Sequence, residues 1–167
     1  MSNSTCDTRI GPFPGWLGGT AALHGRYYAE HWDFPLSFEC MVARDMAELL
    51  LRYDPARDLV LTRLGRDAAF TTLTLDTSDP LLPSGHGHLR WFVAHPAMQG
   101  HGHGRALLDH AMNFARDSGL TLIYLTTFRG LDAAARLYQG VGFQVVDERS
   151  GRTWGRDVIE QRWELCL

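Results

Sequence analysis

The chain has 167 residues, of which 45% are hydrophobic and 21% are charged, a balance typical of a globular domain with a sizeable core. The formal net charge of −3 excludes a general electrostatic attraction to nucleic acid or to anionic membrane surfaces. All 16 basic residues are arginine, which excludes any motif that needs a lysine. Three widely spaced cysteines, Cys6, Cys40 and Cys166, form neither a disulfide framework nor a metal-binding pair.

The first residues are rich in Gly, Pro and Ser, so we expect a flexible tail at 1–15 and a single domain at 16–167. The tail has no basic stretch followed by an apolar run, and no secretory signal peptide is predicted. No apolar stretch approaches the roughly 20 residues that a membrane-spanning helix needs. The sequence therefore predicts a cytoplasmic protein with neither a membrane nor a nucleic acid as partner.

The first half of the domain combines helices with a hairpin. Two helices are predicted between Ala21 and Tyr53, because apolar residues recur there at helical spacing and Asp54-Pro55 ends the pattern. Two strands follow at 58–64 and 68–75, and the short glycine-containing turn between them indicates an antiparallel hairpin.

The second half alternates strands and helices. After a polar loop at 76–87, the predicted order is strand 88–94, glycine-rich turn 95–104, helix 105–118, strand 120–127, helix 132–139, strand 143–147 and strand 158–165. A strand, a helix and a strand in this order form a parallel unit, whereas the earlier strands are antiparallel. We therefore predict an α/β fold with a mixed sheet and helices on both faces.

The strongest signal is the glycine-rich segment that joins a strand to a helix: Gln99, Gly100, His101, Gly102, His103, Gly104 and Arg105. Glycines at alternate positions have no Cβ to crowd a ligand and tolerate positive φ. They coincide with the first N–H groups of the helix, which have no intrahelical acceptor and attract anions. This pattern predicts a diphosphate site, and spacing alone leaves open the alternative of a tight turn without a ligand.

Other interpretations of this region fit less well. A Walker phosphate loop needs a lysine, and the chain has none. A dinucleotide fingerprint needs a third glycine at the position that Arg105 occupies. Histidine pairs such as His86 and His88, or His101 and His103, lack the carboxylate or cysteine that would complete a ligand set, so no metal is predicted.

Two motifs resemble those of the GCN5-related N-acetyltransferase (GNAT) superfamily. The segment 92–108 resembles its cofactor motif, a strand followed by [RQ]-x-x-G-x-[GA], and 134–143 resembles its second motif, A-x-x-L-Y-x-x-x-G-F. Further patterns around Trp91, in 127–134 and in 153–162 are similar to the acetyltransferase domain that is fused to MarR-type winged-helix domains. The resemblance covers about residues 16–165.

The resemblance implies a single-domain GNAT fold, with a mostly antiparallel sheet and a splayed central parallel pair, and acetyl-CoA as the acyl donor. The backbone of Phe92, Val93 and Ala94 would pair with the pantetheine arm, and the amides from Gln99 to Arg105 would hold the pyrophosphate. The Val93 N–H would polarise the thioester carbonyl. Tyr138 matches the general acid that protonates the leaving thiolate; by spacing alone a half-buried helix tyrosine would be the better interpretation, and the presence of both motifs favours the acid.

Two positions depart from the family pattern. Thr126 stands where many relatives carry a glutamate, and Leu131 stands where many carry an asparagine. A free amine is mostly protonated at neutral pH, so a base is expected to assist its attack. Candidate bases are Glu30, His88 and Glu160, each of which could instead be an ordinary surface group.

The resulting hypothesis is an N-acetyltransferase that acts on a primary amine of a small molecule or a protein. The alternative is a non-catalytic module that binds or senses acyl-CoA. The side chains of Trp154, Trp32, Tyr27 and Tyr28 are expected to wall an acceptor pocket or to pack in the core. A homodimer is implied, because relatives often dimerise.

Overall fold

Two helices of 17 residues each, α1 (Trp16–Trp32) and α2 (Leu36–Arg52), begin the fold in the computed structural model, which describes residues 7–167. The chain leaves α1 at Asp33 in a left-handed conformation with φ 56°, and Pro35 precedes α2 as its N-cap. The first helix starts earlier than predicted, because Trp16 is buried and its indole donates a hydrogen bond to Thr72 Oγ1 at 3.0 Å.

A short strand, β1 (Thr8–Ile10), pairs antiparallel with β2 (Leu59–Leu64). The prediction of a flexible tail at 1–15 is therefore wrong for these residues, because their backbone groups are bound into the sheet. Residues 1–6 of the predicted tail lie outside the described residues.

The strands form one mixed sheet in the order β1-β2-β3-β4-β5-β7-β6. The remaining strands are β3 (Phe70–Asp76), β4 (His86–Ala94), β5 (Leu122–Phe128), β6 (Gln144–Gly151) and β7 (Val158–Cys166). Among the described strands only β4 and β5 pair in parallel, and every other pair is antiparallel. The predicted α/β class, with a central parallel pair in a mostly antiparallel sheet, is confirmed.

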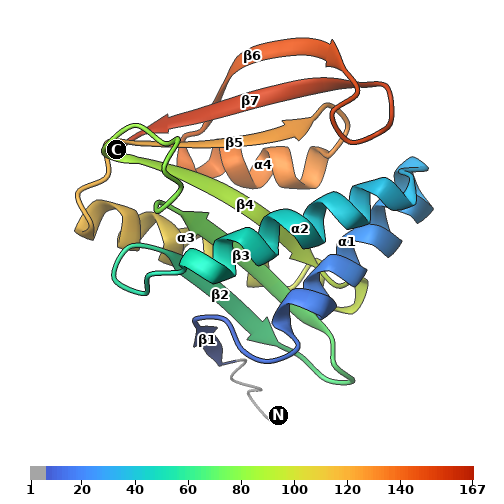
Figure 1. Ribbon diagram of the computed structural model, residues 1–167, viewed down its shortest axis with the longest axis horizontal. Helices are drawn as coiled ribbons and strands as arrows, with labels where there is room; N and C mark the ends of the chain where they lie inside the picture. The colour runs from blue at the N-terminus through green and yellow to red at the C-terminus, as the bar shows by residue number, and fades with distance from the viewer. Residues whose placement is uncertain (1–6) are drawn as a thin grey trace.

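Helices cover both faces of the sheet (Figure 1). Helices α3 (His103–Asp117) and α4 (Asp132–Val141) lie behind it in this view and bury a core that includes Leu107, Leu108 and Phe143. Helices α1 and α2 cross its front and bury a second cluster, to which α2 contributes Phe38, Val42 and Met46. The spacing of four residues between Phe38, Val42 and Met46 places these three on one side of α2.

A β-bulge in β4 shapes the centre of the sheet. Thr72 pairs with Val93 and Thr74 pairs with Arg90, so β4 fits one more residue than β3 into this interval. Trp91, within the bulge, has φ 49°, a left-handed conformation that non-glycine residues rarely adopt. A bulge bends its strand and increases the local twist.

Strands β4 and β5 pair only at their beginnings, His86–His88 against Leu122–Tyr124. Beyond these residues β4 keeps pairing with β3 and β5 keeps pairing with β7, so the two strands diverge. The divergence leaves one edge of each strand facing a gap in the middle of the sheet, as the resemblance predicts.

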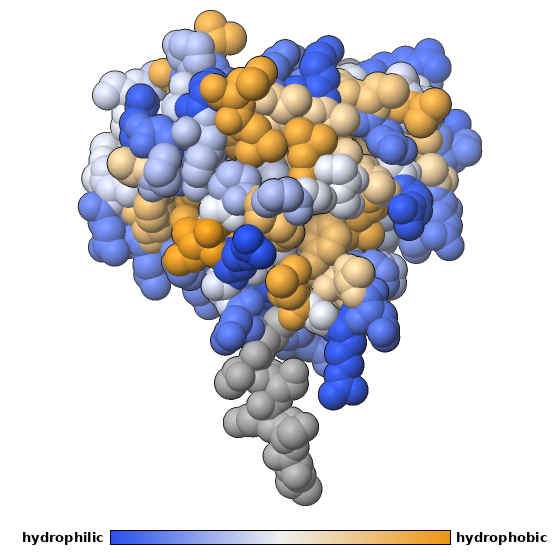
Figure 2. All heavy atoms as spheres, turned by 60° about the horizontal axis from the view of Figure 1, so that its bottom comes forward, coloured by the Kyte–Doolittle hydropathy of each residue, from blue (hydrophilic) through white to orange (hydrophobic). Residues whose placement is uncertain are grey.

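The face that carries the N-terminal end is shown in Figure 2. Apolar side chains gather toward its middle, with hydrophilic side chains around the margins. On β1 and β2 the largest exposed apolar side chains are those of Ile10 and Leu64. Within residues 7–167, none of the helices is long and apolar enough to cross a membrane.

Candidate active site

The glycine-rich turn enters α3 through two left-handed glycines. Gly100 has φ 76° and Gly102, the N-cap, has φ 77°. The first hydrogen bond of the helix runs from the Ala106 N–H to the Gly102 carbonyl at 3.1 Å. The N–H groups of the residues between these two have no intrahelical acceptor, so they and the positive end of the helix dipole can hold an anion.

Gln99 ties this turn to the end of β4. Its side-chain Nε2 donates a hydrogen bond to the Ala94 carbonyl at 3.1 Å. The bond spans the short helical turn Pro96–Met98 and fixes the start of the glycine segment relative to the strand. The sequence placed Gln99 among the cofactor-binding residues, and in the structure its side chain organises the loop.

The polar side chains of the turn differ in their surroundings. Arg105 is half-exposed, and its Nε donates to Asp109 at 2.8 Å along α3. The His103 Nδ1 is buried without a partner among the described residues, and burial, Arg63 and His101 lower the pKa of this ring. His103 is therefore neutral near pH 7, and the anion site depends mainly on backbone amides.

The backbone of β4 alternates in direction beyond the bulge. The His95 N–H donates to the Phe70 carbonyl at 2.9 Å, and Val93 lies two residues earlier in the same register against β3. Because antiparallel pairs alternate, the Val93 N–H also faces β3, while those of Phe92 and Ala94 face the gap. The Val93 N–H predicted to polarise the carbonyl therefore points away from the gap, and the neighbouring N–H of β4 that points into it is that of Phe92.

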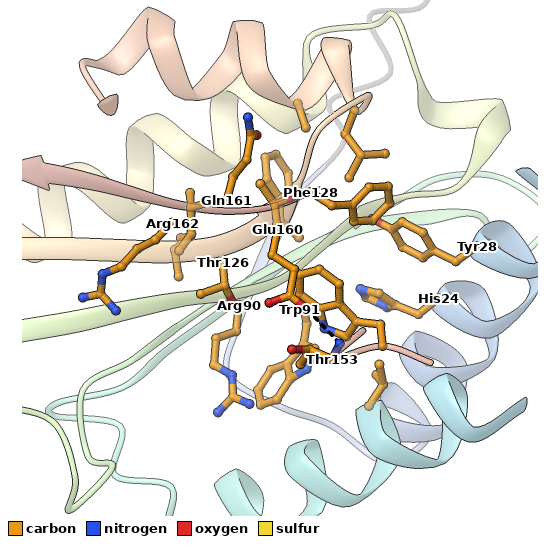
Figure 3. A pocket seen from close by; sticks show the side chains of 18 of the residues that line it. His24, Tyr28, Arg90, Trp91, Thr126, Phe128, Thr153, Glu160, Gln161 and Arg162 are labelled. Atoms are coloured by element: carbon orange, nitrogen blue, oxygen red, sulfur yellow. Dashed lines mark hydrogen bonds between the residues drawn. The ribbon is translucent and has the colours of Figure 1, made fainter. Parts of the chain in front are cut away.

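A cavity of about 500 Å³ opens where β4 and β5 diverge (Figure 3). Its walls come from α1, α2, β4, β5, α4, β6 and β7, together with the loop between β6 and β7. Phe92 and Tyr138 lie on the wall beside the gap. Thr126 lies on the β5 wall, so this wall has a hydroxyl where many relatives carry a glutamate. The cavity therefore adjoins the place where the resemblance puts the thioester.

Tyr138 lies on α4 and is 7% exposed. Its ring packs against those of Phe92, Phe143 and Trp163, at centroid distances of 6.2, 5.9 and 5.9 Å. Burial, with a smaller contribution from the hydroxyl of Tyr28, raises the pKa of Tyr138 above its ordinary value. The hydroxyl therefore keeps its proton at neutral pH, as a general acid requires.

Glu160 on β7 projects into the cavity, while its backbone pairs with Phe128 of β5 (Figure 3). Its carboxylate accepts the Thr153 backbone N–H at 2.8 Å and lies 3.5 Å from the Arg149 Nε. Partial burial opposes its ionisation, but the hydrogen bonds from Thr153 and the charge of Arg149 outweigh burial and lower the pKa of Glu160. An ionised carboxylate thus faces the cavity.

The other two predicted bases are less well placed. Glu30 is exposed and borders a separate surface hollow between the end of α1 and the β6–β7 hairpin. His88 lines the main cavity, but its ring stacks on Tyr124 at 4.2 Å. Burial and, to a smaller extent, the charge of Arg90 lower the pKa of His88 to about 3, so it is a weak base.

The aromatic residues proposed as acceptor walls divide between the two hollows. Trp154 and Tyr28 line the main cavity. Trp32 lines the outer hollow, where its indole packs on Phe128 at 4.9 Å. Tyr27 packs edge-on against Tyr28 at 5.3 Å and lines neither.

Sequence reasoning did not single out His24, which is 5% exposed and lines the cavity from α1. The only signal for it in the sequence is that the segment around His24 is also similar to the acetyltransferase domain fused to MarR-type domains, since a lone histidine on an apolar helix face is usually a packing residue. In residues 7–167, no group of three or more His, Cys, Asp or Glu side chains is arranged to hold a metal ion.

Known proteins with similar sequences and folds bear on this geometry. The sequence model of the acetyltransferase (GNAT) family matches residues 23–143. N-acetyltransferase 8F1 of Rattus norvegicus is 32% identical over 108 residues, which are 63% of this chain and 48% of that protein. The chain therefore spans about half the length of the curated relative it matches.

Solved structures share the fold at low sequence identity. The ribosomal-protein-alanine N-acetyltransferase of Brucella melitensis has a TM-score of 0.72 at 17% identity, over 96% of this chain and 99% of the other. The structure of yncA from Salmonella typhimurium with its cofactor acetyl-CoA has a TM-score of 0.71 at 18% identity, over 98% and 95%. At these identities the comparisons show the fold alone.

The diverging strands and the open N-terminus of α3 define the class of GNAT-type folds, and the acetyltransferases of that family use acetyl-CoA as the acyl donor. The chain belongs to the acetyltransferase (GNAT) family, because the family's sequence model covers well over half of it. The resemblance to this superfamily that the two motifs indicated is confirmed.

Proposed function

We propose that this protein transfers the acetyl group of acetyl-CoA to a primary amine by direct attack. The observation that carries the proposal is the gap between β4 and β5, which has the α3 N-terminus at one end and the Tyr138 side of the cavity at the other. The pantetheine arm would pair with the backbone groups of Phe92 and Ala94 that face the gap. The pyrophosphate would lie on the amides from Gln99 to Arg105.

In the proposed reaction, the neutral amine attacks the thioester carbonyl carbon, so that a C–N bond forms and the C–S bond breaks. The Phe92 N–H would stabilise the developing negative charge on the carbonyl oxygen. The Tyr138 hydroxyl would give its proton to the departing thiolate. The nitrogen loses two protons from its ammonium form, and one proton is released overall.

Glu160 is the proposed acceptor of the first proton. It is ionised, it faces the cavity, and it lies on β7 two residues before Arg162, the partner of Thr126, which replaces the family's usual glutamate on β5. Glu30 lies on the other hollow, and His88 is held neutral against Tyr124, so neither meets both conditions.

The test is an assay of thiol release from acetyl-CoA with a panel of amines, together with the mass of the products. Wild type should release thiol, and the amine product should be heavier than the amine by about 42 Da, the mass of an acetyl group less one hydrogen; Tyr138→Phe should form this product far more slowly. If acetyl-CoA binds but no amine is acetylated, the protein is the non-catalytic acyl-CoA module instead.

One protein with a similar fold is named as a ribosomal-protein-alanine N-acetyltransferase, and at 17% identity its acceptor is not the acceptor proposed for this chain. The particular likeness to domains fused with MarR-type proteins, a cytoplasmic location and a homodimer remain proposals. Light scattering of the purified chain tests the homodimer.

A further inference from the structure

Aromatic rings from four elements wall one end of the cavity: Tyr28 of α1, Trp91 of β4, Phe128 of β5 and Trp154 of the β6–β7 loop. The Phe128 ring lies 5.9 Å from that of Tyr28 and 5.8 Å from that of Trp154, so these three rings form one group. Tryptophan and tyrosine faces attract cations, and their area buries apolar bodies. A cavity of about 500 Å³ has the size of a small-molecule site.

Trp91 occupies this wall at a conformational cost. Its φ of 49° lies in the left-handed region, which costs a non-glycine residue about 1–3 kcal/mol and persists where surrounding structure imposes it. The bulge places the indole on the cavity side, where the Arg90 guanidinium stacks on it at 4.3 Å. Strain of this kind is concentrated at functional sites.

Most charged groups around the cavity already have close partners. Arg90 lies 3.3 Å from Asp45 and 3.4 Å from Asp76, and Arg162 donates to Glu164 at 2.8 Å. In Figure 3 the Arg162 side chain points away from the aromatic end. These arginines would oppose a second positive charge at the far end of a bound molecule.

Glu160 is different, because its only ion pair among the described residues is with Arg149 at 3.5 Å, and Arg149 is 72% exposed. A pair of this length whose arginine is exposed to solvent contributes little. The Glu160 side chain reaches toward the aromatic end (Figure 3). Asp147, the other carboxylate on this side, lies exposed on β6 at the rim. The inner end therefore holds one negative charge with a weak counter-ion.

His24 adds a hydrogen-bond acceptor on the opposite side. Its Nδ1 lies 2.9 Å from the Thr20 carbonyl, which can only accept, so Nδ1 carries the proton and Nε2 has a free lone pair. Burial lowers the pKa of His24 to about 4, and the ring is neutral. Within residues 7–167 Nε2 forms no hydrogen bond, and the ring extends from α1 into the cavity (Figure 3).

We infer that the acceptor is a small primary monoamine with an apolar body, whose ammonium group binds between the Glu160 carboxylate and His24 Nε2. Its body packs on the rings of Tyr28, Trp91 and Trp154. The inference rests on the proposed function, because it assigns an acceptor to the cavity beside Tyr138. A polyamine would bring its second positive charge toward Arg90 and Arg162, which would repel it. A peptide would also have to place the residues that follow its N-terminus between the aromatic walls.

The first experiment measures binding and needs no turnover. Calorimetry compares phenethylamine, which is charged at neutral pH, with 2-phenylethanol, which has the same body without the charge. Phenethylamine should bind about tenfold more tightly or better, and Glu160→Gln should remove the advantage, since hydrogen bonds to charged groups are worth factors of about 10 to 100. Equal binding of the two compounds to wild type would overturn the inference.

Glu160→Gln keeps an oxygen for the Thr153 N–H and removes only the charge. Its matched control is Glu148→Gln on β6, a carboxylate that pairs with Arg129 at 2.7 Å outside the cavity. The control should leave the preference for phenethylamine intact. If both variants lose the preference equally, the preference comes from the overall negative charge of the protein, and the contact with Glu160 is disproved.

The second experiment measures steady-state kinetics with acetyl-CoA. His24→Gln should raise KM for phenethylamine about tenfold and leave KM for acetyl-CoA unchanged. His31→Gln is the control, because His31 lies on the same helix and contacts the Tyr27 carbonyl at 2.8 Å, but is exposed and outside the cavity. Trp154→Leu, which leaves α1 intact, should also raise KM for the amine.

The acceptor panel separates the two levels of the argument. Phenethylamine should exceed both spermidine and a peptide with an N-terminal alanine in kcat/KM by at least about tenfold. Preference for spermidine or the peptide would overturn the acceptor inference and leave the acetyltransferase intact. If phenethylamine binds through its charge but no amine is acetylated, the amine site stands and the proposed acetyltransferase function is overturned.

Discussion

The ring of Phe92 on β4 lies 3.1 Å from the position at which a Cβ on Gly104 of α3 would stand. Leu137 of α4 lies 3.4 Å from the same point, so strand and both helices meet at a residue without a side chain. This close approach brings the N-terminus of α3 to the gap between β4 and β5. The glycine of the motif is therefore a packing requirement as well as an opening for a ligand.

Gly104→Val should lower the free energy of unfolding by about 1–3 kcal/mol, because the branched side chain overpacks the contact with Phe92. It should also raise KM for acetyl-CoA, since α3 is displaced from β4. Urea unfolding and steady-state kinetics measure the two effects. Gly18→Ala is the control: no atom lies within 4 Å of its Cβ position in α1, and it should stabilise by about 0.5–1 kcal/mol. If Gly104→Val changed neither the free energy of unfolding nor KM, β4 and α3 could move apart without cost.

Tyr138→Phe should lower kcat about 10²- to 10⁴-fold, because it removes the proton donor and retains the ring that packs on Phe92. Binding of acetyl-CoA and the unfolding temperature should change little. Tyr124→Phe is the matched control, since Tyr124 lies on β5 under Arg162 and outside the cavity. Equal kcat values for the two variants would remove Tyr138 from the mechanism.

Stability should fall in acid between about pH 6.5, the ordinary pKa of histidine, and pH 4. The folded-state pKa of His24 is lowered by burial, so the unfolded chain takes up a proton in this range that the folded chain refuses. Each such histidine contributes a slope of about 1.4 kcal/mol per pH unit, and His88 should add a second. Urea titrations at several pH values measure the slope, which His24→Gln should reduce. In NMR, a His24 ring that titrates near pH 6.5 would contradict its neutral state.

Asp76 is fully buried at the end of β3, and burial opposes its ionisation. Two hydrogen bonds from Arg52, at 2.9 and 2.6 Å, outweigh burial and, helped by the charge of Arg90, lower the pKa of Asp76. Its contribution is therefore present above the ordinary carboxylate range, near pH 4, and is lost as pH falls through the lower folded-state value.

Asp76→Asn should lower the free energy of unfolding by about 2–3 kcal/mol at neutral pH, because Arg52 and Arg90 lose their shared carboxylate. Urea unfolding measures the change. Asp109→Asn, which breaks the half-exposed pair with Arg105, should cost less than about 0.5 kcal/mol. Similar losses in the two variants would show that the buried network has no special weight.

Local patterns in the sequence predicted most of the elements. Helical spacing of apolar residues located α2 and α3, and the strand–glycine–helix order predicted the parallel pair, because these signals involve residues close together in the chain. The short strand β1 was missed, since its pairing with β2 joins residues about fifty positions apart. The glycine-rich turn before α3 was also predictable, because its residues are contiguous in the chain.

The direction of a backbone group was not predictable in this way. Whether the N–H of Phe92 or of Val93 faces the gap depends on the register with β3 and on the bulge at Trp91, which no local pattern specified. The acceptor side was equally inaccessible from spacing. His24 and Glu160 are 136 positions apart (160 − 24), and only packing of α1 and β7 around the divergence brings both to one cavity.

The sequence by itself therefore determined the family, the glycine-rich turn at the start of α3 and the place of Tyr138 in the second motif, because each depends on contiguous residues. The tertiary structure decided which amides face the gap and which of the three candidate bases is an ionised group at the cavity. It also brought in the histidine on α1. Those choices depend on strand register, helix docking and burial, which are set by contacts between residues far apart in the chain.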